Sequence, residues 1–185
     1  MIDLTKLKEC STVTTVPQSD NIFTELGKNT YDYKDLLSEL IDNCIAAQIP
    51  NRRLQVTISI FVDADNHPKM FIIKDNASGI PQNNLGLAIT PAGLQSSSSL
   101  NEHGLGMKQA VAALGDLNYL ATKTEGEKDA RIVREFKFGD IRTFLSTFDQ
   151  DSGTELCICN LKPIVVTNSA SITRSLRKKP PKTKT

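Results

Sequence analysis

The sequence predicts an α+β fold, a two-layer sandwich in which helices cover one face of a mixed, mostly antiparallel sheet. The first observation is an amphipathic helical pattern at residues 33–47. The second is a pair of alternating segments at 54–62 and 69–75, and the third is a series of short strand patterns after residue 116. The order of helix, two strands, helix and about four strands is typical of this architecture.

The helix at 33–47 is predicted from its apolar stripe, which repeats at helical spacing. The stripe consists of Leu36, Leu37, Leu40, Ile41, Cys44 and Ile45. Pro50 and Asn51 follow and end the helix. The preceding residues 1–20 show no sustained period, and the first structured turn is expected near residues 20–26.

Two strands follow the helix and form an antiparallel pair. LQVTISIFV at 54–62 alternates apolar and polar residues, as a half-buried strand does. The turn DADNHP leads to the second strand, KMFIIKD, at 69–75. Glycine, proline and amide residues then make DNASGIPQNN a loop that runs into a helix start.

The second half of the chain begins with a long loop, TPAGLQSSSSLNEHG at 90–104. Loops of this length inside a domain are usually functional lids or disordered inserts. A helix opened by glycines is expected at 107–114, and strands are expected in LNYLATKT, RIVREFKF, IRTFLSTF and TELCICNL. A turn at Gly139 and Asp140 should join the middle two strands.

Composition indicates an ordinary soluble protein. The chain has 185 residues, of which 39% are hydrophobic and 23% are charged, enough for one domain with a real core. We expect an N-terminal segment at 1–20, a domain at 21–168 and a basic tail or cut linker at 169–185. Neither a membrane-spanning stretch nor a signal-peptide core is visible, so the expected location is cytoplasmic. Cys157 and Cys159 are interpreted as reduced thiols and not as a zinc site.

The charge of the chain is unevenly distributed. The net charge is +1, but the last twelve residues, RSLRKKPPKTKT, carry six bases and no acid. Without them 16 bases face 21 acids, which gives a body of −5. Bulk electrostatics therefore does not indicate a nucleic-acid partner.

Four local patterns suggest chemistry. Glu39, Asp42 and Asn43 share one face of the predicted helix at i, i+3 and i+4. KDNASGIP at 74–81 ends a strand in Asp75 and turns at Gly79. HGLGMKQA at 103–110 opens a helix with glycines, a setting that favours anions. DSGTEL at 151–156 opens a strand. Each pattern alone has an ordinary reading: a solvated helix face, a turn, a helix cap or a hairpin.

Taken in order, ELIDN, DNASGI, HGLGMK and SGT resemble the ATP-binding domain of the GHKL superfamily. That superfamily includes DNA gyrase B, a class of heat-shock chaperones, MutL proteins, MORC ATPases and histidine kinases. The four motifs span residues 39–154. The resemblance implies the Bergerat ATP-binding fold, ATP and Mg²⁺ as ligands, and slow ATPase activity that drives a conformational switch, as in chaperone-like relatives.

The resemblance assigns roles to individual residues. It makes Glu39 the general base that orients water toward the γ-phosphate. It makes Asn43 the Mg²⁺ ligand, through an amide oxygen. Asp75 would accept a hydrogen bond from the adenine amino group, Gly79 would let the backbone pass beneath adenine, and Thr154 would share an ordered water with Asp75.

The remaining positions of the four motifs are expected to contact the nucleotide as well. Gly104, Leu105 and Gly106 would offer backbone N–H groups to the phosphates, and Lys108 would add positive charge. In this interpretation the lid spans about residues 83–106. The other expected contacts are Asp42, Ile80 and Met107.

Three positions depart from the family pattern. Ala46, Ala77 and Asn101 stand where relatives usually have an acid, a glycine and a glycine. They leave the base, the metal ligand and the adenine acid in place, and they bear on affinity and rate. The phosphate cradle G-x-x-x-x-G-K-[ST] does not occur in the sequence.

The resemblance also implies partners. In gyrase-like and chaperone-like relatives a following transducer domain supplies a lysine for hydrolysis, and subunits dimerise when ATP binds. A further domain or a partner protein would supply that lysine here, and residues 1–20 are a candidate exchanging segment. Two alternatives stay open: a histidine-kinase-like catalytic domain, and a nucleotide-sensing interaction module with little or no hydrolysis.

Overall fold

The computed structural model describes residues 1–15, 32–90, 106–137 and 139–165. The predicted helix at 33–47 is confirmed as α2 (Tyr33–Ala46). A capping box starts it: the Asp32 carboxylate accepts hydrogen bonds from the N–H groups of Lys34 and Asp35, and the Asp35 carboxylate accepts one from the Asp32 N–H. The first helical turn thus has its exposed donors satisfied.

The strands form one seven-stranded sheet in the order β1-β6-β5-β4-β7-β3-β2. The strands are β1 (Lys8–Thr15), β2 (Val56–Val62), β3 (Pro68–Asp75), β4 (Asp116–Lys123), β5 (Ala130–Val133), β6 (Gly139–Ser146) and β7 (Gly153–Cys159). Every described pairing is antiparallel. The α+β class is confirmed. The sheet was predicted to be mixed and mostly antiparallel, whereas its described pairings include no parallel one.

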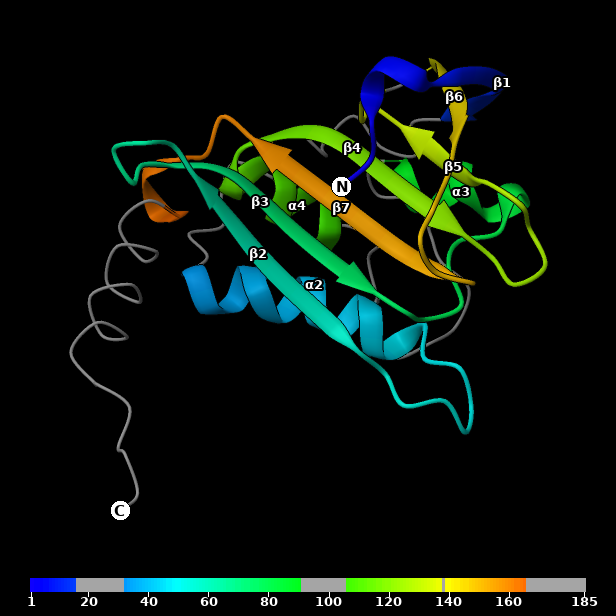
Figure 1. The fold of residues 1–185 in the computed structure, drawn as a ribbon, viewed down its shortest axis with the longest axis horizontal. Coiled ribbons are helices and arrows are strands. Elements are labelled where there is room, and N and C mark those ends of the chain that lie inside the picture. The colour runs from blue at the N-terminus through cyan, green and yellow to red at the C-terminus, as the bar shows by residue number, and fades with distance from the viewer. Residues whose placement is uncertain (16–31, 91–105, 138, 166–185) are drawn as a thin grey trace.

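The helices lie together on one face of the sheet (Figure 1). They are α2, α3 (Gln82–Ile89) and α4 (Gly106–Leu114). Their apolar residues pack with the inward-facing side chains of the strands in one core, of which Leu36, Leu85 and Leu114 are fully buried members. The helix starts expected near residues 82 and 107 are both confirmed.

A smaller core lies on the opposite face of the sheet. It combines Tyr119, Ile132 and Cys157 with Ile2 and with the partly buried Leu4, which belongs to a short 3-10 helix, η1 (Leu4–Lys6). The N-terminal segment therefore covers part of the face that the helices leave open (Figure 1).

Two expectations about the strands were wrong. The first twenty residues contain β1, which pairs with β6 although its sequence shows little periodicity. Gly139 opens β6 with φ +85° instead of forming the predicted turn with Asp140, and β5 already ends at Val133. The structured turn expected near residues 20–26 lies outside the described residues.

Residues 83–89, the first part of the expected lid, belong to α3, and residues 91–105 lie outside the described part. Across the described ranges, no helix has both the length and the apolar character that crossing a bilayer requires.

Candidate functional site

A cavity of about 320 Å³ opens between the helices and the sheet, within the size range of small-molecule sites. It is bounded by α2, α3, the start of α4 and the ends of β3 and β7. The lining residues are Leu40, Asn43, Cys44, Ala46, Ala47, Ile73, Asp75, Gly79, Ile80, Pro81, Asn84, Leu87, Ala88, Met107, Thr154 and Leu156. The wall is mostly apolar with a few convergent polar groups.

Asp75 is the acidic group in this wall. It ends β3 and is 6% exposed. Its Oδ1 atom accepts hydrogen bonds from the N–H of Ala77 at 2.9 Å and of Thr154 at 3.1 Å. Burial raises the pKa of the Asp75 carboxyl, and hydrogen bonds from Ala77, Cys44 and Thr154 offset part of that rise. The carboxylate is therefore held rigidly at the cavity wall.

Cys44 is a lining residue that the predicted nucleotide site did not include. Its thiol is buried and donates to the carbonyl of Leu40 at 3.3 Å. Burial and the neighbouring Asp75 carboxylate raise the pKa of this thiol to about 12. It is therefore a neutral, compact wall residue. In the sequence, the one indication that Cys44 belongs to the site is its position directly after Asn43.

Close backbone packing explains the glycines near Asp75. Gly79 has φ +72°, and a Cβ there would overlap the carbonyl oxygen of Lys123 on β4. Gly153 has φ +137°, and a Cβ there would overlap the carbonyl oxygen of Asp75. Both positions bring strands and turn together where a side chain would push them apart. The packing against β4 therefore explains the glycine at position 79 without reference to any ligand.

Thr122 on β4 ties the turn to β7. Its hydroxyl accepts from the N–H of Ile80 at 2.7 Å and lies 3.3 Å from the Thr154 hydroxyl. The side chain is 1% exposed. Nothing in the local sequence distinguishes this threonine from other strand threonines, so sequence reasoning missed it.

The polar face of α2 meets the start of α4. The Asn43 amide nitrogen donates to the carbonyl of Glu39 at 2.6 Å, which fixes the amide group at the cavity wall. The Glu39 carboxylate lies against Gly106, where a Cβ would overlap its Oε2 atom. Glu39 and Asp42 are partly exposed and do not line the cavity.

The first residues of α4 divide between the cavity and the core. Met107 lines the cavity. Lys108 is 6% exposed and sits outside the lining, and burial lowers the pKa of its ammonium group to about 8. Gly104 and Leu105 lie outside the described residues, as does Asn101. Two of the residues that differ from the family pattern lie in the described part of the chain. Ala46 lines the cavity, and the backbone N–H of Ala77 donates a hydrogen bond to the Asp75 carboxylate.

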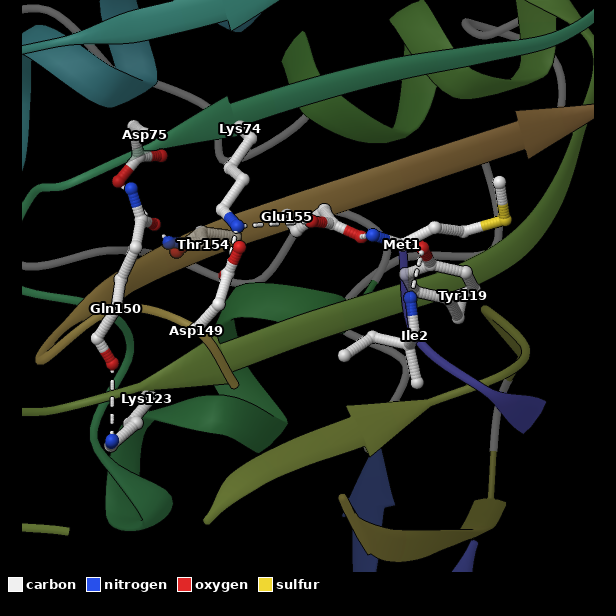
Figure 2. A network of polar contacts seen from close by, with 10 residues as sticks. All are labelled: Met1, Ile2, Lys74, Asp75, Tyr119, Lys123, Asp149, Gln150, Thr154 and Glu155. Atoms are coloured by element: carbon white, nitrogen blue, oxygen red, sulfur yellow. Dashed lines mark hydrogen bonds and ion pairs between the residues drawn. The ribbon is translucent and has the colours of Figure 1, made fainter. Parts of the chain in front are cut away.

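A polar network supports the site from the other face of the sheet (Figure 2). Glu155 on β7 is 2% exposed and accepts from the Tyr119 hydroxyl at 2.5 Å. Lys74 on β3 lies 3.5 Å from Glu155 and also pairs with Asp149. Lys74 and Glu155 lie opposite each other on β3 and β7. Each is next in sequence to a residue that lines the cavity: Lys74 precedes Asp75, and Glu155 follows Thr154. The pair therefore fixes the two strands directly behind the cavity.

The side chains at the α2–α4 end fit a magnesium ion and phosphates. The Asn43 amide oxygen and the Glu39 carboxylate are hard oxygen ligands, and the Glu39 carboxylate occupies the space that a side chain at Gly106 would fill. Gly106 begins α4, and helix starts favour anions. A second cluster of possible metal ligands among the described residues lies in the β2–β3 turn and consists of Asp63, Asp65 and His67. There the Asp63 carboxylate accepts hydrogen bonds from the backbone N–H groups of Asp65 and His67.

A family model described as "Histidine kinase-, DNA gyrase B-, and HSP90-like ATPase" matches residues 31–142, more than half of the chain. The matched range includes Glu39, Asn43 and Asp75. A search of curated protein sequences found no significant match.

Solved structures share the fold widely, with 329 significantly similar chains. One is the "Crystal Structure of N terminal domain of a DNA repair protein", with a TM-score of 0.52 and 18% sequence identity. The similarity covers 86% of this chain and 44% of that chain, so this chain spans less than half of the other's length. At this identity the likeness shows the fold alone.

Proposed function

Because the chain belongs to the histidine kinase-, DNA gyrase B- and HSP90-like ATPase family, we propose that it binds ATP with Mg²⁺ and hydrolyses it slowly as a conformational switch. The observation that supports this most directly is the cavity. One pocket is lined by the buried Asp75 carboxylate, the Asn43 amide and Met107 in the first turn of α4, and the Glu39 carboxylate lies just outside this lining, against Gly106.

The adenine would lie at the β3–β7 end. There the Asp75 carboxylate accepts a hydrogen bond from the adenine amino group, since its Oδ1 is already oriented by two backbone N–H groups. Ile80 and Leu156 offer apolar surface to the ring. Thr154 and Thr122 provide hydroxyls beside Asp75 for an ordered water.

The phosphates would lie between α2 and the start of α4. Mg²⁺ would neutralise phosphate charge there, held through the Asn43 amide oxygen. The backbone N–H groups in the first turn of α4 would donate hydrogen bonds to the phosphates, because helix starts favour anions. Glu39 orients water and accepts its proton.

One observation favours a second candidate, a nucleotide sensor with little turnover. The Glu39 carboxylate rests against Gly106 and does not line the cavity. In this arrangement the base must move before it can meet water at the γ-phosphate. A lysine supplied by a transducer domain or a partner protein, together with ATP-induced dimerisation, would complete the site.

The test is calorimetric titration with a non-hydrolysable ATP analogue, with and without Mg²⁺. We expect Mg²⁺-dependent binding to the wild type and its loss in Asp75→Asn. Asp65→Asn, the same change in the exposed β2–β3 turn, serves as the control and should bind normally. Absence of binding to the wild type, or unchanged binding to Asp75→Asn, would refute the proposal.

A further inference from the structure

β2 is one edge of the described sheet; it carries neither a charge nor a proline, and its one register shift lies at its last residue, Val62. Edge strands of monomeric proteins commonly carry charges, proline or a bulge that prevents pairing with other chains. β1, the opposite edge, begins with Lys8 and Glu9 and has a register shift between Glu9 and Ser11. It is therefore protected in the usual way.

β2 reads VTISIFV, with neither a charge nor a proline. Its register against β3 is regular from Val56 to Phe61 and shifts only at Val62. Three of its apolar side chains are unusually exposed: Ile58 at 40%, Phe61 at 41% and Val62 at 51%. A long, regular, apolar edge is suited to strand pairing.

The order of residues in β2 fits an antiparallel copy of itself. If Ser59 lies opposite Ser59 of the second copy, Ile58 faces Ile60 and Thr57 faces Phe61. Val56 and Val62 complete the register. Each pair keeps its face of the sheet, because residues two apart share a face. We propose that β2 pairs with β2 of a second copy of this chain, extending the sheet across a two-fold axis.

Charge at the two ends of β2 supports this occupant. The segment before β2 contains the exposed Arg53, and the turn after it contains the exposed Asp65. Within the described part of the chain, neither takes part in an ion pair. In an antiparallel self-pair the basic start of one strand lies near the acidic end of the other, at both ends of the interface.

Strand pairing alone buries little surface, but α2 adds to it. α2 packs under β2 and β3 (Figure 1), and the side of α2 that carries Glu39 faces α4. Ile45 lies on another side of α2 and is 45% exposed. With the axis normal to the sheet, both copies of α2 lie on the same face and flank the paired strands.

The first test is sedimentation of the full chain without nucleotide over a range of concentrations. The wild type should associate reversibly to twice its 20.3 kDa mass. Ser59→Lys places two like charges opposite each other and should weaken association by roughly tenfold or more. Thr12→Lys puts a lysine on the other edge strand and should leave association unchanged. A monomeric wild type, or a dimer that tolerates Ser59→Lys, overturns the proposal.

The second test measures the register by disulfide formation in a Cys10→Ser background, which removes the exposed native thiol. Ser59→Cys should form a disulfide-linked dimer on oxidation, since directly opposite residues have Cα atoms roughly 5 Å apart. Thr57→Cys is the matched control, because the two copies of residue 57 would be separated by about 13 Å. Equal cross-linking of both variants contradicts the register, and cross-linking of neither contradicts the interface.

Discussion

Asp75 combines the properties that a base-recognition residue needs. Two backbone donors fix one carboxylate oxygen, and burial places the group in surroundings where a correct hydrogen bond counts more than in water. Burial alone would favour the neutral acid, as the raised pKa of the carboxyl shows. The backbone donors counter this tendency and keep the acceptor available.

Glu39 can be separated from binding. Glu39→Gln should retain affinity for the ATP analogue, because the cavity wall is unchanged, and should lower phosphate release by about 100-fold or more because the amide cannot accept a proton. Phosphate release and calorimetric titration measured together check this. Glu135→Gln, on the exposed connection before β6, is the control. Normal turnover in Glu39→Gln would show that Glu39 is not the base.

Gly79 allows a prediction about stability that does not depend on nucleotide. Gly79→Ala should lower the free energy of unfolding by about 2 kcal/mol or more, since it adds left-handed strain and a clash with the Lys123 carbonyl. Gly126→Ala is a matched control, because Gly126 has φ +84° but nothing within 4 Å of its added Cβ. Urea denaturation of both variants isolates the steric part. Equal losses would show that the contact with β4 is not tight.

At the scale of elements, the cross-strand pair between β3 and β7 links the two faces of the sheet. The side chains of Lys74 and Glu155 belong to the outer face, whereas Asp75 and Thr154 belong to the cavity. The position of the site therefore depends on how these two strands are held from behind. Tyr119 on β4 adds a third strand to the same network.

This pair should show strong coupling in a double-mutant cycle. Lys74→Met leaves the buried Glu155 without its lysine and should cost about 3 kcal/mol of unfolding free energy. Lys74→Met combined with Glu155→Gln should cost less than the sum of the two single changes, because no buried charge is then left uncompensated. Thermal or urea unfolding of the four proteins checks this. Additive losses would mean that the pair contributes no coupling.

At the scale of the whole molecule, patterns that are local in sequence predicted well. The α2 stripe, the β2–β3 pair and the α+β class depend on periodicity within one segment, and all three are confirmed. β1 was missed because KECSTVTT is mostly polar and becomes a strand only through β6, whose sequence lies far along the chain. Edge pairing of this kind leaves little trace in the strand itself.

The site residues also divide into those that local sequence motifs predicted and those that only the three-dimensional fold reveals. Asn43, Asp75, Gly79, Ile80, Met107 and Thr154 were predicted and line or bound one cavity. Thr122 was not predicted, because its contribution arises only when the sheet brings distant segments together. Asn84 and Ala88 fell within the expected lid at 83–106 but were not named as contacts, and they line the cavity from α3. Lys108 was expected to add positive charge near the phosphates, but in the structure it is buried in α4 and does not line the cavity. The catalytic and binding roles themselves stay proposals.

Burial of Lys108 predicts a pH dependence of folding. Its pKa is about 8 in the folded chain, against 10.5 as the ordinary value. Between these values the unfolded chain binds a proton that the folded chain has lost, so this group's contribution to stability rises with pH in that window. Below about pH 8 the buried charge destabilises by its full amount, at most about 3 kcal/mol.

Lys108→Met removes this titration, and the difference in unfolding free energy between wild type and variant isolates it from other groups. Relative to Lys108→Met, the wild type should become more stable as pH rises from about 8 to 10.5 and change little below that window. Urea denaturation at a series of pH values measures the difference. Lys34→Met, at an exposed position of α2, should show no such slope. Parallel profiles for wild type and Lys108→Met would place the ammonium group in contact with water, and α4 would then be oriented differently at the mouth of the cavity.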